Sequence, residues 1–263
     1  MEILRLEHVS ITYDGEHNAV DDISFTAGEG QIIGIVGESG SGKSTLLHSI
    51  TGLLPRGAGC RGTFSLFGKD IHALPRKELM QMRGQDVSMI FQDTGRYMNP
   101  ITRIGNQYTE FLQVHGMKSR QECLQTERDM LARVHLHDAD RVLRSYPFEL
   151  SGGMRQRVGI AMAMTLKPRL LLADEPTSAL DVTVQAQVVY EMMELRRKYG
   201  TTILIVTHNM GVAAYMADMI GVMQHGRLVE WGKTEDVISH PREEYTRTLL
   251  ASIVELDDER LTG

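Results

Sequence analysis

The chain has 263 residues, of which 42% are hydrophobic and 24% are charged, and its formal net charge at pH 7 is −6. This length is sufficient for one large domain or for a core with a subdomain, and the composition is that of an ordinary soluble globular protein. The acidic charge offers no electrostatic basis for binding nucleic acid, and two isolated cysteines, Cys60 and Cys123, indicate neither a disulfide framework nor a metal cluster.

The cysteine usage fits a reducing cytosol. The first residues, Met1–Arg5, do not show the basic region and apolar run of a signal peptide. No apolar stretch of the sequence approaches the ~20 residues that a membrane-spanning helix needs. We therefore expect any role at a membrane to be peripheral.

The first part of the chain is predicted to be rich in strands. Residues Glu2–Tyr13 roughly alternate apolar and polar side chains, as a half-buried strand does. Residues Gly28–Gly30 form a predicted turn, and the segment Gly52–Gly62 is rich in glycine and proline and is predicted to be a loop. Further strands are predicted at Val20–Phe25, Gln31–Val36 and Thr63–Gly68.

A glycine-rich segment follows the predicted strand Gln31–Val36. Residues Gly37–Ser44 fit the pattern G-x-x-x-x-G-K-[ST] of a P-loop, and a helix is predicted to start at Thr45. Such a turn directs several backbone N–H groups to one point at the positive end of a helix, which suits a polyphosphate. Lys43 would reach the β- and γ-phosphates of ATP, and the Ser44 hydroxyl would bind Mg²⁺. The predicted ATP-binding residues of this segment are Gly37, Glu38, Ser39, Gly40, Ser41, Gly42, Lys43, Ser44 and Thr45.

The middle of the chain, from about Asp93 to Lys167, is polar, with apolar residues spaced as in amphipathic helices. Strands return after it. The remaining predicted elements are strands at Val87–Gln92, Leu170–Ala173 and Ile203–Val206, a helix at Val184–Tyr199, a hairpin of Met219–Met223 and Leu228–Trp231, and helical turns at Thr234–His240 and Tyr245–Ile253.

Two carboxylates, Asp174 and Glu175, follow the apolar strand Leu170–Ala173. In a P-loop nucleotidase the acid at the end of such a strand holds Mg²⁺ through water, so Asp174 is predicted to do so. Glu175 is predicted to polarise a water in line with the γ-phosphate as a general base. On its own this pair is more often a solvated loop, and the upstream P-loop favours the catalytic interpretation.

A second phosphate-binding helix start is predicted at Ser151. This residue is followed by Gly152, Gly153 and a long helical stretch, so it is expected to be an N-cap beside an exposed backbone nest. Because one nucleotide has no evident need of two such sites, we expect this one to bind the nucleotide held by another subunit. The segment resembles the signature motif of the ATP-binding cassette (ABC) ATPases, and it lies just before the Asp174–Glu175 strand, as that family requires.

Further landmarks are similar to those of the ABC ATPases, and the resemblance covers essentially the whole chain. It implies that Tyr13 stacks on adenine, that Gln92 senses Mg²⁺ and the γ-phosphate, and that His208 contacts the γ-phosphate. The predicted catalytic residues are thus Lys43, Gln92, Glu175 and His208, and Ser44, Gln92 and Asp174 are expected around the Mg²⁺ of Mg-ATP. Gln156 joins Ser151, Gly152 and Gly153 as a predicted contact in trans, and the predicted dimer-interface loop is Ser178, Ala179, Leu180 and Asp181.

The resemblance also implies a fold, an α/β P-loop NTPase core with an antiparallel β subdomain and an inserted α-helical subdomain. The expected parts of this single ABC ATPase domain are residues 1–92 (first part of the core), 93–167 (helical subdomain with the signature motif), 168–232 (second part of the core) and 233–263 (C-terminal helical segment). Two cassettes would face each other head to tail with ATP between them, and hydrolysis would reopen the pair.

Several segments resemble the importers of peptides and nickel. They are Tyr146–Leu150, Asp174–Gln187, Met98–Pro100 and Tyr245–Leu250. The implied function is uptake of nickel or of di- or oligopeptides, driven by ATP hydrolysis. The implied partners are a second cassette that is a different chain, two integral membrane permease subunits and an extracytoplasmic binding protein. The implied location is the cytoplasmic face of the bacterial plasma membrane.

Departures from that pattern bear on the cargo. The chain stops at Gly263 without a cysteine-bearing extension, which favours the shorter nickel-importer cassettes. Asp93–Tyr97 lacks the usual proline after Gln92, so the choice of membrane partner is expected to differ. Asn209 replaces a common aspartate, but His208 is intact, and hydrolysis is expected to be retained.

Two other functions are alternatives to that of an importer. A soluble ABC ATPase of translation or DNA repair generally carries two cassettes or a long coiled-coil insert, and this sequence shows neither. A regulatory cassette without hydrolysis would be expected to alter Lys43, Ser151 or Glu175, and all three are present.

Overall fold

The computed structural model describes residues 1–178 and 180–251, so Ala179 of the predicted interface loop and residues 252–263 of the predicted C-terminal segment lie outside the described residues. The chain divides into two compact units. The first contains Met1–Met80 and the chain from Thr202 onward, and the second is Gln81–Thr201.

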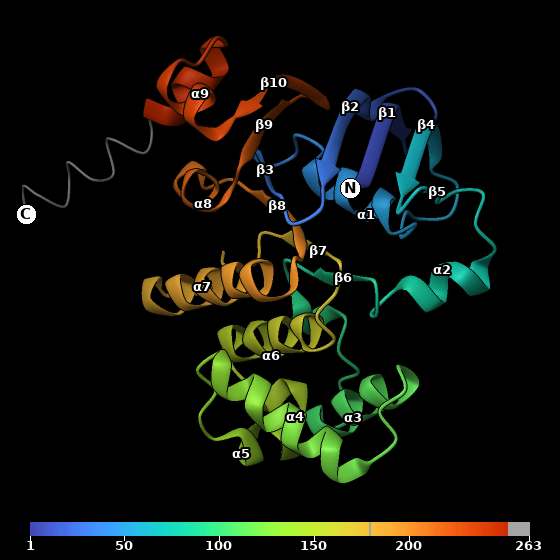
Figure 1. The fold of residues 1–263 in the computed structure, drawn as a ribbon, viewed down its shortest axis with the longest axis vertical. Helices are drawn as coiled ribbons and strands as arrows, with labels where there is room; N and C mark the ends of the chain where they lie inside the picture. Colours follow the sequence, from blue (N-terminus) through green and yellow to red (C-terminus); the bar gives the residue numbers. More distant parts are fainter. Residues whose placement is uncertain (179, 252–263) are drawn as a thin grey trace, which may run out of the picture. The chain divides into compact units, whose positions relative to one another are not determined.

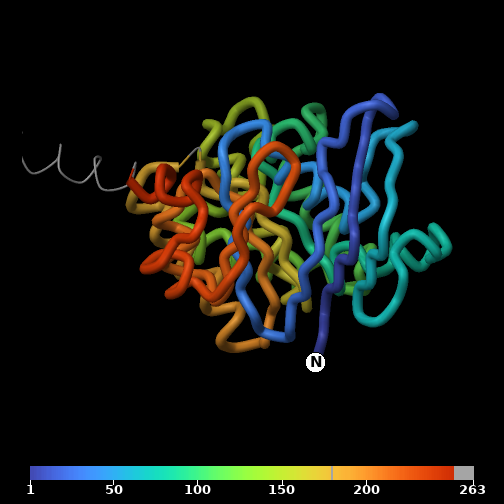
Figure 2. The backbone as a smooth tube through the Cα atoms, turned by 90° about the horizontal axis from the view of Figure 1, so that it is seen from above, coloured from blue at the N-terminus to red at the C-terminus, as the bar shows by residue number. Residues whose placement is uncertain are grey.

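An antiparallel sheet occupies the beginning of the first unit (Figure 1). Its strands lie in the order β2-β1-β4-β5, and every neighbouring pair is antiparallel. The long pair β1 and β2 is drawn in blue in Figure 2. The predicted antiparallel β subdomain is therefore confirmed. The strands are β1 (Glu2–Thr12), β2 (Asn18–Gly28), β4 (Gly59–Leu66) and β5 (Lys69–Asp70).

The start of β4 differs from the prediction, which places Gly59–Gly62 in a loop. These residues lack an apolar alternation, and three of the four are exposed. They are held as strand by pairing with β1, in which Thr12 is opposite Gly59 and Ile11 is opposite Cys60. A backbone ladder supplied by a distant segment thus decides their conformation.

The second sheet of this unit has β3 at its centre. β3 is parallel to β8 on one side and to β9 on the other, and β10 is antiparallel to β9, so the predicted hairpin is confirmed. Every residue of β3 and β8 is buried, as expected for parallel strands covered on both faces. The strands are β3 (Ile32–Val36), β8 (Thr202–Thr207), β9 (Met219–Gln224) and β10 (Arg227–Lys233).

Short helices accompany this sheet. A side-chain atom on Gly34 of β3 would lie 3.0 Å from Ala213 Cβ, so the absence of a side chain lets α8 approach the strand. These helices are α1 (Lys43–Ile50), α8 (Met210–Met216) and α9 (Thr234–Ser239), followed by helical residues 244–251. A further helix, α2 (Arg76–Met82), follows β5 in the chain and crosses the boundary between the units. The sequence does not predict α2 and α8, because each is too short to show a clear period.

The second unit combines a parallel strand pair with helices. β6 (Val87–Ile90) pairs with β7 (Leu170–Asp174), and α4 contacts α3, α5 and α6. Tyr108 of α3 is fully buried, and its hydroxyl bonds to Thr165 of α6. The helices are η1 (Thr94–Arg96), α3 (Ile104–Val114), α4 (Arg120–Arg133), α5 (Ala139–Arg144), η2 (Pro147–Glu149), α6 (Gly152–Thr165) and α7 (Val182–Tyr199).

Across residues 1–178 and 180–251, no helix combines the length and apolar character that crossing a bilayer requires.

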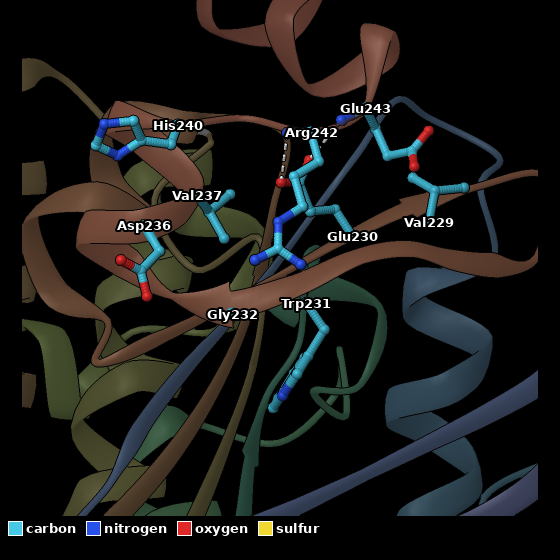
Figure 3. A pocket seen from close by; sticks show the side chains of 9 residues that line it. All are labelled: Val229, Glu230, Trp231, Gly232, Asp236, Val237, His240, Arg242 and Glu243. Atoms are coloured by element: carbon cyan, nitrogen blue, oxygen red, sulfur yellow. Dashed lines mark hydrogen bonds between the residues drawn. The ribbon is translucent and has the colours of Figure 1, made fainter.

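A buried carboxylate attaches the C-terminal helical residues to β10 (Figure 3). Glu230 is 8% exposed, and it accepts the backbone N–H groups of Arg242 at 2.9 Å and Glu243 at 3.2 Å. Burial raises the pKa of Glu230, but the backbone N–H groups, the Thr246 hydroxyl and the positive charge of Arg242 together outweigh this effect, and the net pKa is lowered. The charged carboxylate therefore stabilises the folded state.

This attachment should depend on pH. Because the pKa of Glu230 is lower in the folded than in the unfolded chain, its stabilisation is present above the unfolded pKa and is lost as the pH falls through the folded pKa. We expect Glu230→Gln to lower the free energy of unfolding at neutral pH by about 1–2 kcal/mol and to lose less stability on acidification. Thermal unfolding across pH checks this, with Glu235→Gln on the exposed face of α9 as control. Parallel pH profiles of parent and Glu230→Gln would contradict it.

Candidate active site

The glycine-rich loop joins β3 to α1. Gly42 is the N-cap of α1 and has φ of 97°, a conformation that side chains disfavour. A Cβ atom on Gly42 would lie 2.1 Å from the carbonyl oxygen of Ala19, which leaves no space for one. The loop therefore depends on glycine at this position for its backbone conformation and for its contact with β2.

Lys43 is buried at the start of α1, with 4% of its surface exposed. Its ammonium donates to the carbonyl oxygens of Gly37 at 2.8 Å and Glu38 at 2.6 Å. The cation is thus held against the loop, beside the N-terminus of a helix, and both carry positive potential. This combination suits an anion such as a polyphosphate.

Tyr13 lies next to the loop's helix. Its hydroxyl donates to Thr45 Oγ1 at 3.0 Å, and 48% of the residue is exposed. The structure therefore brings together two predicted ATP-binding residues that are 32 positions apart in the sequence. An exposed ring at this position is available for stacking on a base.

His208 leaves the sheet at the same edge as the P-loop. β3 and β8 are adjacent and parallel, with Val36 opposite Thr207, so the residues after each strand start from one end of the sheet. His208 is exposed there. Asn209, which stands where aspartate is common, is the N-cap of α8, and its side chain accepts the N–H of Val212 at 3.2 Å. Aspartate can perform the same capping role.

Tyr245 also contacts the loop, and no sequence pattern indicated this. Its hydroxyl accepts the N–H of Glu38 at 3.0 Å across 207 positions of sequence. Burial raises the pKa of the Tyr245 phenol, which therefore stays protonated and neutral at physiological pH. Local sequence holds no signal for such a contact, because it depends on where the C-terminal helical residues pack.

In the second unit, Gln92 and Glu175 are in contact. Gln92 Nε2 donates to Glu175 Oε2 at 3.1 Å. The two residues follow the parallel strands β6 and β7, in which Ile90 is opposite Ala173. Asp174, the last residue of β7, is 3% exposed. The two carboxylates therefore differ: Asp174 is buried at the end of its strand, whereas Glu175 contacts the polar side chain of Gln92.

The backbone at Glu175 is held in an unusual conformation, with φ of 43°. Its carbonyl oxygen accepts both the N–H and the hydroxyl of Ser178, at 3.3 and 3.1 Å. Positive φ at a residue other than glycine is uncommon and requires support from the surroundings. Ser178, from the predicted interface loop, supplies that support.

The start of α6 confirms the predicted N-cap. Ser151 Oγ accepts the N–H of Met154 at 3.2 Å, and Ser151 and Gly152 are exposed. Gly153 follows in the first turn. Gln156, one turn further on, is different: it is 3% exposed, and its amide bonds within the unit. Its side chain is therefore not presented to a second subunit.

The rest of the predicted interface loop leads into α7. The N–H of Leu180 donates to the carbonyl oxygen of Thr177 at 3.1 Å, and Asp181 is the N-cap of α7, accepting the N–H of Val184 at 3.0 Å. The predicted helix thus begins two residues earlier than expected. The predicted site residues form two groups, with Tyr13, the P-loop and His208 in the first unit and the others in the second.

Comparison with protein families finds one matching family, described as ABC transporter, over residues 20–178. The oligopeptide transport ATP-binding protein OppD of Salmonella typhimurium is 43% identical over 259 residues, which cover 98% of this chain and 77% of that protein. A probable D,D-dipeptide transport ATP-binding protein, DdpD of Escherichia coli, is 45% identical over 240 residues, covering 90% of this chain and 73% of that protein.

Solved structures share the fold. A dimeric ATP-binding cassette in a post-hydrolysis state, bound to ADP and Pi, aligns with a TM-score of 0.80 at 28% identity, covering 88% of this chain and 99% of that one. A second structure, the ATP-binding subunit of an ABC transporter, aligns with a TM-score of 0.77 at 25% identity, covering 96% and 99%. The predicted α/β cassette fold is confirmed.

The two loop glycines Gly40 and Gly42 should respond differently to substitution. Gly40 has φ of 81°, and a Cβ atom there would have nothing within 4 Å, so Gly40→Ala costs about 1–2 kcal/mol of backbone strain alone. Gly42→Ala adds a clash with the Ala19 backbone. We expect Gly42→Ala to abolish binding of a fluorescent ATP analogue and Gly40→Ala to weaken it less. Equal losses in the two variants would contradict this account of the loop.

Proposed function

This chain belongs to the ABC transporter family, whose cassettes couple ATP hydrolysis to transport, and we propose that it is the ATP-hydrolysing subunit of a peptide importer. The observation that carries the proposal is the match to OppD, a protein named for oligopeptide transport, along 98% of this chain. DdpD, named for D,D-dipeptide transport, supports the same class of cargo.

Nickel is less well supported than peptides as the cargo. The sequence motifs alone are compatible with both nickel and peptides, and they favour the short nickel-importer cassettes. The relatives reported above carry peptide names, and neither is named for nickel. We therefore propose di- or oligopeptides as the cargo.

The P-loop would bind the phosphates of ATP. The Lys43 ammonium and the α1 N-terminus provide the positive potential that the phosphates require, and Tyr13 offers a ring for adenine. The oxygen donors proposed for Mg²⁺ are Ser44, Gln92 and Asp174, which are of the type that this hard cation prefers. A bound Mg²⁺ would neutralise charge that develops on the phosphates.

Hydrolysis would use the second group of residues together with His208. We assign Glu175 as the general base that orients water, Gln92 as its neighbour toward the γ-phosphate, and His208 as the γ-phosphate contact. The 3.1 Å contact between Gln92 and Glu175 supports the pairing of these roles, since the carboxylate has an amide partner at the catalytic end of β7.

A second cassette would complete the site. The exposed start of α6, with Ser151 as its N-cap, would bind the nucleotide held by the P-loop of the partner cassette. Ser178, Ala179, Leu180 and Asp181 would lie along the interface. We propose that two permease subunits and an extracytoplasmic binding protein complete the importer, with this chain peripheral to the cytoplasmic face of the membrane.

Measurements of ATP binding and ATP turnover distinguish the role proposed for Lys43 from that proposed for Glu175. We expect Lys43→Ala to lose ATP binding, because the phosphates lose their buried cation. Glu175→Gln should bind ATP and form a closed pair with its partner cassette, but hydrolyse at least about 100-fold more slowly, as expected for loss of a general base. Phosphate release and equilibrium ATP binding by the purified transporter check both. Parental turnover in either variant would refute that residue's assignment.

Cargo is tested by uptake into intact cells. Parent and Glu175→Gln strains are compared for uptake of a labelled dipeptide, a labelled oligopeptide and nickel. The proposal expects peptide uptake to be lost and nickel uptake to be unchanged. Loss of nickel uptake alone would replace the peptide cargo with the metal.

A further inference from the structure

One side-chain amide bonds to both loops that carry the reacting groups. Gln156, on α6, donates through Nε2 to the carbonyl oxygen of Phe91 at 2.9 Å and to that of Pro176 at 3.3 Å. Phe91 directly precedes Gln92, and Pro176 directly follows Glu175. The amide therefore ties together the backbones on either side of the contact between Gln92 and Glu175.

The orientation of this amide is set by Thr94. Gln156 Oε1 accepts the Thr94 hydroxyl at 2.8 Å and the Thr94 N–H at 3.3 Å. Because the Thr94 N–H can only donate and the two carbonyl oxygens can only accept, the amide oxygen must face Thr94, and Nε2 must face the carbonyl oxygens. Gln156 is 3% exposed, so its bonds are not weakened by competition with water.

The approach of Thr94 to α6 depends on Gly159. A Cβ atom at this position would lie 2.2 Å from Thr94 Cγ2 and 2.7 Å from its hydroxyl oxygen. Gly159 lies inside a helix, where glycine costs about 1 kcal/mol relative to alanine. The glycine therefore lowers the stability of the helix, but it leaves the space that Thr94 needs to bond to Gln156.

We propose that Gln156 is a positioning residue for ATP hydrolysis, which acts by fixing the separation of Gln92 and Glu175. The inference rests on the proposed function of those two residues. The bonds to Phe91 and Pro176 hold the loops, and the 3.1 Å contact between Gln92 and Glu175 follows from their placement. The role differs from a direct contact with the partner's nucleotide, because the amide is buried and its donors and acceptor are used within the unit.

The primary variant is Gln156→Met, which keeps the length of the side chain and removes all four bonds. We expect kcat to fall by about 10–100-fold, the size of effect that small displacements of catalytic groups produce. KM for ATP and the affinity for ATP without Mg²⁺ should change by less than about twofold, because the P-loop is untouched. A residue that contacts nucleotide in trans would instead raise KM or weaken ATP-dependent pairing of the cassettes.

A control variant on the same helix tests whether loss of stability alone lowers kcat. Thr165→Val removes a buried hydroxyl that bonds to Tyr108 and to the Ala161 carbonyl oxygen and contacts neither loop. It should lower Tm and leave kcat at the parental value. If Gln156→Met fails to fold, Thr94→Val and Thr94→Ser replace it. Loss of kcat in Thr94→Val, with most of it restored in Thr94→Ser, is expected, because serine keeps the hydroxyl donor to Gln156.

The outcomes distinguish a failure of the positioning role from a failure of the proposed function. Parental kcat in Gln156→Met, or in Thr94→Val where that pair is used, overturns the positioning role while Glu175→Gln remains inactive. A fall in kcat matched by Thr165→Val at equal loss of Tm overturns it as well, since stability alone would then explain the effect. An inactive parent, or a Glu175→Gln variant as active as the parent, overturns the proposed function itself.

Discussion

Parallel pairing of buried strands is the constraint on which the candidate site depends. The strands β3 and β8 are buried along their whole length, and Val36 lies opposite Thr207. In the second unit Ile90 of β6 lies opposite Ala173 of β7. Since parallel strands end at the same edge, each pair delivers two polar loops to one place, and burial of the apolar strands stabilises that placement. A shift of one residue in either register would turn side chains to the opposite face.

Buried and half-buried polar groups then connect the loops to the rest of each unit. In the first unit the Lys43 ammonium holds the carbonyl oxygens of the P-loop, and the hydroxyl of Tyr245 accepts the N–H of Glu38 from outside the loop. Tyr245 itself belongs to the C-terminal helical residues, whose preceding backbone is bound by Glu230. The conformation of the P-loop thus depends on Tyr245, which lies 207 positions after Glu38 in the sequence. The C-terminal helical residues therefore support the backbone of this loop.

In the second unit a neutral amide performs the corresponding task. Gln156 binds backbone carbonyl oxygens beside Gln92 and beside Glu175, and Thr94 fixes its orientation. A neutral amide has two donors and an acceptor at fixed angles, so it can hold two loops without introducing a charge near the Glu175 carboxylate. The exposed Ser151 is the N-cap of α6, and the buried Gln156 lies in the second turn of the helix. The start of this helix is therefore exposed, whereas its second turn bonds to the loops that carry Gln92 and Glu175.

Sequence by itself determined the chemistry of the site. The pattern Gly37–Ser44, the acids Asp174 and Glu175 after an apolar strand, and the cap at Ser151 are local, because adjacent residues supply both the backbone conformation and the functional groups. The buried strands and the longer helices could be predicted for the same reason. The extended start of β4, the contact of Tyr245 with Glu38 and the four bonds of Gln156 were decided by tertiary structure. Each joins segments far apart in the chain, and hydrogen-bond partners at that distance are selected by packing, which no local pattern records.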